Sequence, residues 1–163
     1  MNKISIKENK SKITNTENIK KEKNMDKPLV MEFDYNVPKN DVWEAMTNPE
    51  KMKIWYFPQL KEFEPKVGYE FKFEDRNDEY RKKWGVTKIE KPNTFAHNWS
   101  YKGYQGESEV TFDLIATHNR TKIRVTHTGL DSFPNDPHFK RERFEWGWNN
   151  LLGKNLKTLL END

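Results

Sequence analysis

The sequence predicts an α+β domain in which a curved antiparallel β-sheet is covered on one face by a long C-terminal helix. Residues 136–160 carry apolar side chains at spacings of three and four, the pattern of an amphipathic helix. Residues 67–129 form short segments of alternating apolar and polar side chains between turn residues, the pattern of strands. The 163 residues suit one domain, and 13% aromatic residues are too many for a disordered chain.

The first 27 residues differ in composition from the rest. They contain eight lysines, four acidic residues and no aromatic side chain. Such a segment buries too little apolar surface to offset the entropy lost on ordering, about 1–2 kcal/mol per residue. We expect a disordered lysine-rich tail at residues 1–27 and one folded domain at residues 28–163. The alternative for the tail is a basic arm that binds an acidic partner.

The net charge of +3 belongs to that tail, because residues 28–163 hold 21 basic and 22 acidic side chains. This balance gives no support for binding of nucleic acid, which favours a basic face. The chain has no cysteine, which excludes disulfides, thiolate nucleophiles and thiolate metal sites. No apolar run approaches the ~18 residues of a membrane span, and the chain does not open with a signal-peptide pattern. We therefore expect a cytoplasmic protein.

The folded part opens with a strand and two short helices. Residues 29–37 alternate, which places Leu29, Met31, Phe33 and Tyr35 on one face. Pro38 suits the first turn of a helix at residues 38–47. Asn and Pro at positions 48 and 49 then end this helix and begin a second one at residues 49–55. The two helices precede the rest of the sheet.

Short strand segments follow, joined by turns. Residues 58–63 are an ambiguous edge segment, and strands are expected at residues 69–74, 84–89, 94–101, 107–117 and 121–128. Short loops between consecutive strands predict an antiparallel meander. One face is apolar and the other is polar, as where helices cover one side of a sheet. The inward side chains are Tyr69, Phe71, Phe73, Phe95, His97, Trp99, Tyr101, Val110, Phe112, Leu114, Ile123, Val125 and His127.

The last predicted element is the helix over residues 136–160. Its charged side chains, among them Lys140, Arg141 and Arg143, face solvent, and this basic run is either a solvated surface or a contact for an anion or partner. The apolar stripe consists of Phe144, Trp148, Leu151, Leu152, Leu156, Leu159 and Leu160. Such a stripe needs a broad apolar surface to lie on, and the sheet supplies one.

Five segments resemble, in order, the family named for activators of the heat shock protein 90 ATPase. They are PKNDVWEAMTNPEKMKIWYFP, KVGYEFKFE, WGVTKIEKPNTFAHNW, TKIRVTHTGL and GWNNLLGKNLKTLLE, and the likeness covers residues 29–161. This family lies within the START-like superfamily, also called Bet v-like or SRPBCC. The resemblance implies a helix-grip fold, a strongly bent antiparallel sheet wrapped around a long C-terminal helix, with two short helices after the first strand.

The resemblance implies two kinds of partner. Eukaryotic co-chaperones similar to this family, which act in the stress response, carry an additional N-terminal domain, where this chain has the lysine-rich tail. Many stand-alone members resemble modules that bind small ligands. A chaperone and a small hydrophobic molecule are therefore the two partners that the resemblance suggests.

The space between the sheet and the last helix is the expected ligand site. Pockets for small molecules are mostly apolar with a few placed polar groups. Aromatic walls suit a flat apolar ligand such as a lipid, polyketide or flavonoid-like molecule; the alternative is that the rings fill the core. The candidate lining residues are Trp55, Phe57, Phe71, Phe73, Trp84, Phe95, Trp99, Phe112, Phe133, Phe144, Trp148 and Leu152.

Two inward histidines, His97 and His127, complete the candidate site. They could orient a carbonyl or hydroxyl of a ligand or transfer a proton, because the pKa of imidazole, about 6.5, lies near neutrality. The alternative is that each bonds a neighbouring strand or buried water. Nothing supplies a third ligand for zinc at a recognisable spacing. We expect His118, in a hairpin, and His138 to be solvated.

Catalytic patterns are missing from the sequence. None of the predicted inward side chains of the sheet is acidic, and the sequence contains neither a GxSxG motif nor a Gly-rich phosphate loop. We therefore expect non-catalytic binding of a small hydrophobic molecule, with no cofactor and no metal, which predicts an enclosed aromatic cavity of several hundred Å³. A co-chaperone-like interaction would instead predict a filled core and an exposed patch. A cyclase- or dehydratase-like enzyme using His97 or His127 would place a polar group with a perturbed pKa deep in the cavity.

Overall fold

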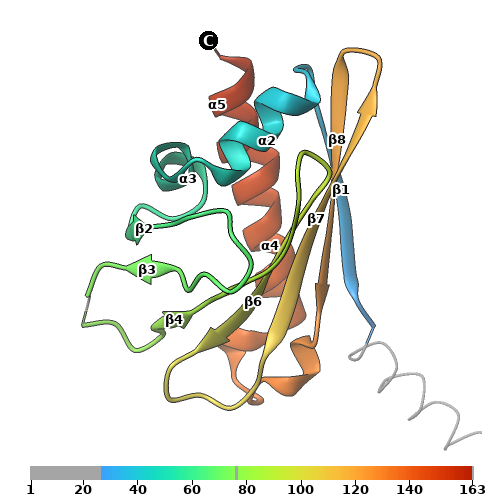
Figure 1. The fold of residues 1–163 in the computed structure, drawn as a ribbon. Helices are drawn as coiled ribbons and strands as arrows, with labels where there is room; N and C mark the ends of the chain where they lie inside the picture. The colour runs from blue at the N-terminus through green and yellow to red at the C-terminus, as the bar shows by residue number, and fades with distance from the viewer. Residues whose placement is uncertain (1–26, 76, 163) are drawn as a thin grey trace, which may run out of the picture.

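The structure, a computed structural model, describes residues 27–75 and 77–162 and has the predicted α+β helix-grip architecture (Figure 1). The predicted disordered tail lies outside the described residues, apart from Lys27. The N-terminal and central elements are β1 (Leu29–Tyr35), α2 (Lys39–Thr47), α3 (Pro49–Trp55), β2 (Leu60–Glu62), β3 (Lys72–Phe73), β4 (Lys82–Lys83), β5 (Val86–Glu90), β6 (Thr94–Tyr101), β7 (Ser108–Thr117) and β8 (Arg120–Thr128). They are followed by the 3₁₀ turns η1 (Leu130–Ser132) and η2 (Pro137–Phe139) and by α4 (Arg141–Asn150), η3 (Leu151–Leu156) and α5 (Lys157–Glu161).

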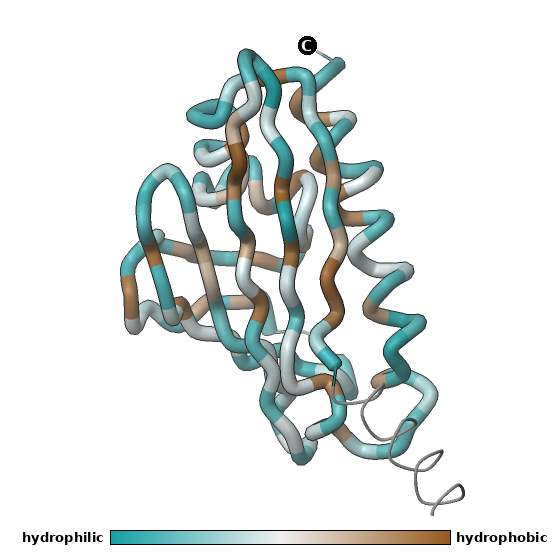
Figure 2. The backbone as a smooth tube through the Cα atoms, turned by 90° about the vertical axis from the view of Figure 1, so that its right-hand side faces the viewer, coloured by the Kyte–Doolittle hydropathy of each residue, from teal (hydrophilic) through white to brown (hydrophobic). Residues whose placement is uncertain are grey.

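The main sheet is antiparallel, in the order β1-β8-β7-β6-β4, and β5 also pairs with β6. β6, β7 and β8 form the predicted meander, and β1 closes one edge by pairing with β8. Figure 2 shows apolar and polar residues alternating along these strands. The inward residues of β7 and β8, such as Phe112 and Val125, are fully buried. The predicted face of the sheet therefore forms the core.

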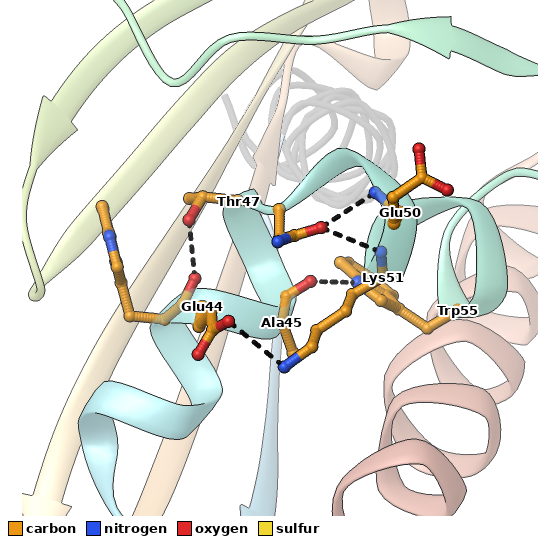
Figure 3. A network of polar contacts seen from close by, with 8 residues as sticks. Glu44, Ala45, Thr47, Glu50, Lys51 and Trp55 are labelled. Carbon is orange, nitrogen blue, oxygen red and sulfur yellow. Dashed lines mark hydrogen bonds and ion pairs between the residues drawn. The ribbon is translucent and has the colours of Figure 1, made fainter.

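The predicted corner of two helices is held by side-chain caps (Figure 3). The Asn48 side chain accepts hydrogen bonds from the backbone N–H groups of Glu50 and Lys51, at 2.9 and 3.3 Å, and Pro49 occupies the first helical position. The indole of Trp55 donates to the carbonyl of Ala45 at 2.8 Å, which joins α3 to α2. These contacts hold α2 and α3 together, and α2 packs against β7 and β8 of the sheet.

The last helix begins later than the sequence predicts. Residues 137–139 form a separate 3₁₀ turn, in which Asp136 accepts from the backbone N–H of His138, and Lys140 is extended. The continuous helix runs from Arg141 to Glu161, and its middle, η3, winds as a π-helix. In η3 the ring of Phe33 from β1 lies 3.2 Å from where a Cβ on Gly153 would stand. A side chain at position 153 would therefore fit only if the ring of Phe33 moved by a few tenths of an ångström.

The helix runs along one face of the sheet (Figure 1) and is tied to β1. The Tyr35 hydroxyl donates to the carbonyl of Leu152 at 2.7 Å. The Lys157 ammonium donates to the carbonyl of Asp34 at 3.0 Å, and the backbone N–H of Asn36 donates to Oε1 of Glu161 at 2.8 Å. The first strand and the last helix of the domain thus stabilise each other.

Two predicted strands are shorter or divided. Only Lys72 and Phe73 of residues 69–74 form a strand, and β3 pairs with β2 in a separate two-stranded sheet. Of residues 84–89, only residues 86–89 belong to a strand, β5. Gly85 forms an isolated bridge with Glu70, and its N–H donates to the side chain of Asn98. Residues 68–71 still contact this segment through backbone bonds such as Phe71 N–H to Trp84 C=O. This side of the molecule therefore consists of short, weakly paired strands.

None of the helices in the described part of the chain is long and apolar enough to cross a membrane.

Candidate functional site

Much of the space between the sheet and the helix is filled by side chains. Trp55 lies edge-on to Phe112 with ring centroids 6.5 Å apart, and Phe95 lies 5.7 Å from Phe112. Leu152 packs in the same core cluster. Six of the predicted site residues are buried here and line none of the pockets described below: Trp55, Phe95, His97, Phe112, His127 and Leu152.

His97 is hydrogen-bonded on both ring nitrogens. Its Nδ1 lies 2.8 Å from the carbonyl of Asn98, and its Nε2 lies 2.8 Å from the hydroxyl of Tyr56. Nδ1–H therefore donates to the carbonyl, and Nε2 accepts from the tyrosine, whose pKa burial raises well above 10. Burial lowers the pKa of His97 to about 4, against the opposing effect of the bond to Asn98. The ring is neutral at pH 7 and serves as a packed, paired core residue.

His127 lies in a second buried network. The indole N–H of Trp148 donates to its Nδ1 at 3.3 Å, so Nε2–H donates to the hydroxyl of Ser108 at 2.9 Å. Ser108 in turn donates to the carbonyl of Trp99. Burial lowers the pKa of His127 to about 3, with a further contribution from His97. Both inward histidines are thus hydrogen-bonded to groups of the protein, which was the alternative to orienting a ligand.

An open groove of about 290 Å³ lies along α4, and we call it the aromatic groove. Its walls come from β6, α4, the segment after α3 and the segment before β4. Trp99 stands at 67° to Trp148 with centroids 5.6 Å apart, and the Trp99 indole donates to the hydroxyl of Tyr101 at 2.7 Å. The lining residues are Phe57, Asp78, Tyr80, Lys82, Trp99, Tyr101, His138, Arg143, Phe144, Trp146, Gly147, Trp148 and Leu151.

The aromatic groove combines predicted and unpredicted residues. Sequence analysis named four of its rings: Phe57, Trp99, Phe144 and Trp148. Lys82 places its ammonium 4.7 Å from the centroid of Phe57, a cation–π contact. His138 stacks on Tyr80 at 3.6 Å, so it is partly buried rather than freely solvated, and burial and then Arg143 lower its pKa. Tyr101 was recognisable from its inward position on β6, whereas Tyr80 and Lys82 stood in a charged segment with no periodic signal.

A larger pocket of about 690 Å³ lies on the other side of β4, and we call it the charged pocket. It shares Asp78, Tyr80 and Lys82 with the aromatic groove. Three predicted residues form its apolar wall: Phe71, Phe73 and Trp84. The remaining lining residues are Gln59, Glu70, Lys72, Glu74, Asp75, Arg81, Lys83 and Lys102. Both pockets are partly open to solvent, so neither is the enclosed cavity that the sequence analysis expected for a ligand.

Phe133, the last predicted site residue, lines neither the aromatic groove nor the charged pocket. It lines a surface pocket of about 620 Å³ near η1 and η2, together with Leu130 and Phe139. Within residues 27–75 and 77–162, no three His, Asp or Glu side chains are grouped so that they could hold a metal ion.

Comparison with known proteins identifies the family of this chain. Residues 36–161 match the family described as activator of Hsp90 ATPase homolog 1-like protein. The chain belongs to this family. No curated protein matches the chain in sequence.

Several solved structures share the fold of this chain. Protein MLL2253 from Mesorhizobium loti is 24% identical with a TM-score of 0.67, covering 83% of this chain and 98% of its own. BH1534 from Bacillus halodurans is 23% identical with a TM-score of 0.64, covering 82% and 96%. PFC0360w, an HSP90 activator from Plasmodium falciparum, is 24% identical with a TM-score of 0.61, covering 77% and 91%. At these identities the likeness shows the common helix-grip fold.

Proposed function

We propose that this protein binds a small, flat, apolar molecule in the aromatic groove without transforming it. The observation that carries the proposal is the convergence of rings from separate segments, Phe57, Trp99, Phe144 and Trp148 among them, on one open groove. Small-molecule sites are mostly apolar with a few polar groups that fix orientation, and Lys82, Arg143 and His138 are such groups here.

The size of the groove narrows the ligand class. Ligand pockets span about 300–1,000 Å³, and the aromatic groove, at about 290 Å³, lies at the lower end. A compact molecule of one or two fused rings therefore fits better than a long lipid chain. Binding without catalysis is supported by His97 and His127, since both are neutral, hydrogen-bonded and outside the lining of the groove.

A thermal-shift panel of bicyclic aromatic compounds tests this function. A ligand at one hundred times its dissociation constant should add about 2.7 kcal/mol to the free energy of unfolding. The blocking variant is Gly147→Leu, because a Cβ at this groove position meets no atom within 4 Å, which leaves open space for a larger side chain to occupy part of the groove. Asn149→Leu, at an exposed α4 position outside the groove, is the matched control.

The expected result is a shift for the native chain and Asn149→Leu, and none for Gly147→Leu. A panel that leaves the native melting temperature unchanged, or a Gly147→Leu variant that responds as well as the native chain, would contradict the proposal.

A second candidate function is binding of a partner protein through α4. Trp146 is 64% exposed, and tryptophan is the residue most enriched among binding hot spots. The family and the Plasmodium neighbour, an HSP90 activator, suggest a chaperone as the partner. Calorimetry with purified heat shock protein 90 tests it. Trp146→Glu should abolish binding, whereas Ile54→Glu, at an equally exposed position on α3, should not. Equal binding by the native chain and Trp146→Glu would rule out this surface.

A further inference from the structure

Trp84 carries the one buried side-chain polar atom without a hydrogen-bond partner among the described residues. Its side chain is 2% exposed, and its indole N–H has no acceptor within bonding distance. Three other buried indoles are paired: Trp55 donates to Ala45, Trp99 to Tyr101 and Trp148 to His127. The fold therefore supplies acceptors for these three indoles and supplies none for Trp84.

An unpaired buried donor is costly. Leaving such a group unsatisfied costs about 1–3 kcal/mol, and native proteins contain few of them. A phenylalanine at position 84 would avoid the cost in a surrounding that is already aromatic, because Phe57, Phe71 and Phe73 lie edge-on to the indole at 5.0–5.7 Å. The large ring of Trp84 packs on His97 and Trp99, with centroids 4.7 and 4.1 Å apart. Its unpaired N–H is the feature that packing does not explain.

Trp84 lies at the inner wall of the charged pocket. Phe71 and Phe73 extend that wall, and Phe73 is only partly buried and belongs to the two-residue strand β3. β3 pairs with β2 alone, and the Phe73 ring lines the pocket beside the indole, 5.5 Å from Trp84 between ring centroids. A displacement of this partly buried ring would bring a guest molecule to the indole N–H. Lysines 72, 82, 83 and 102 and Arg81 surround the wall, together with Glu70, Glu74, Asp75 and Asp78.

We propose that the charged pocket is a second binding site, for a planar aromatic molecule that bears an oxygen acceptor, and that the indole N–H of Trp84 donates to that oxygen. The flat body of the ligand lies against Phe71 and Phe73. The carbonyl, phenol or carboxylate oxygen reaches Nε1, and the surrounding lysines and arginine accommodate an acceptor that carries negative charge. This site goes beyond the aromatic groove and does not depend on binding there.

A pair of probes of equal shape tests the proposal: 2-acetylnaphthalene, which has a carbonyl oxygen, and 2-isopropenylnaphthalene, in which a methylene group replaces that oxygen. Both are titrated into the ¹⁵N-labelled full chain and into Gly147→Leu, where a larger side chain occupies part of the aromatic groove. The readout is the indole N–H resonance of Trp84, assigned by its loss in Trp84→Phe or, if that variant does not fold, by through-space contacts to Phe71 and Phe73.

The expected result is a downfield shift of the Trp84 indole proton with the acetyl probe alone, in both backgrounds, and about tenfold tighter binding than that of the isopropenyl probe. Equal affinity for the two probes overturns the proposal, as does an unmoved Trp84 resonance while other indoles respond, or an absence of binding. An indole proton held upfield in every sample also overturns it, because the N–H is then directed at a neighbouring ring. A Trp84 response that disappears in Gly147→Leu together with binding would show that the probe binds in the aromatic groove, and this result also overturns the proposal.

Discussion

The interior of the molecule has two halves that differ in how completely they are closed. Beneath α2, α3 and η3, the inward faces of long paired strands bring Trp55, Phe95 and Phe112 into a packed cluster that lines none of the pockets. Beside β4 and α4, strands of two or three residues adjoin the aromatic groove and the charged pocket. The same kind of side chain is therefore core in one half and wall in the other, even along a single strand such as β6.

The largest expected effect concerns the boundary between the halves, where His97 and His127 are buried neutral. Their pKa values, about 4 and about 3, lie below the unfolded value of about 6.5. Above pH 6.5 both states are neutral and stability is complete; below it the unfolded chain takes up protons that the folded chain does not. Between pH 6.5 and 4.5 the two residues together should remove on the order of 5 kcal/mol from the free energy of unfolding.

Denaturant titrations across this pH range check the effect. His127→Gln should reduce the dependence on pH by about half, whereas His118→Gln, at an exposed hairpin position, should leave it unchanged. A native chain with the same stability at both pH values would show that the buried imidazoles are already accessible to water.

The second effect compares a ring from each half. Phe112→Ala removes a fully buried ring from the closed half and should cost about 3–5 kcal/mol. Phe57→Ala removes a partly exposed ring from the open half and should cost about half as much, because water can enter the space. Urea denaturation of both variants measures the difference. Equal costs would mean that the aromatic groove is closed in solution.

The third effect compares two indoles. Trp55→Phe and Trp84→Phe remove the same volume, but only the first breaks a hydrogen bond and leaves the carbonyl of Ala45 without its donor. Trp55→Phe should therefore be more destabilising by about 1–2 kcal/mol in thermal unfolding. If the two variants are equally unstable, the Trp84 indole has a partner of its own in solution.

The smallest effect compares two glycines of the last helix. Gly147→Ala adds a methyl group in open space beside the aromatic groove and should stabilise the helix by about 1 kcal/mol. Gly153→Ala brings the same methyl group within 3.2 Å of the ring of Phe33, so that gain should be lost or reversed. Melting temperatures of the two variants should move in opposite directions. If Gly153→Ala is stabilising, the ring of Phe33 on β1 moves away from the helix at little cost in free energy.

The sequence predicted the fold well because its signals are periodic. Alternation along β6, β7 and β8 placed Trp99, Phe112 and His127 inward, and each of them is buried. It could not separate core from groove, since alternation identifies a face and not how neighbouring rings interlock: Phe95 and Trp99 lie on the same face of one strand, one in the closed half and the other in the groove wall. The start of α4, the π-helical turn and the unpaired indole of Trp84 depend on tertiary contacts that no local pattern encodes.

The bonds between β1 and the last helix have a consequence for synthesis. Tyr35 leaves the ribosome more than one hundred residues before Leu152, the residue whose carbonyl it will bind. Throughout that interval the apolar side of the emerging sheet has no cover, and nascent chains with uncovered strands are prone to association. The apolar face of the sheet therefore receives its full cover only after the last helix has been translated.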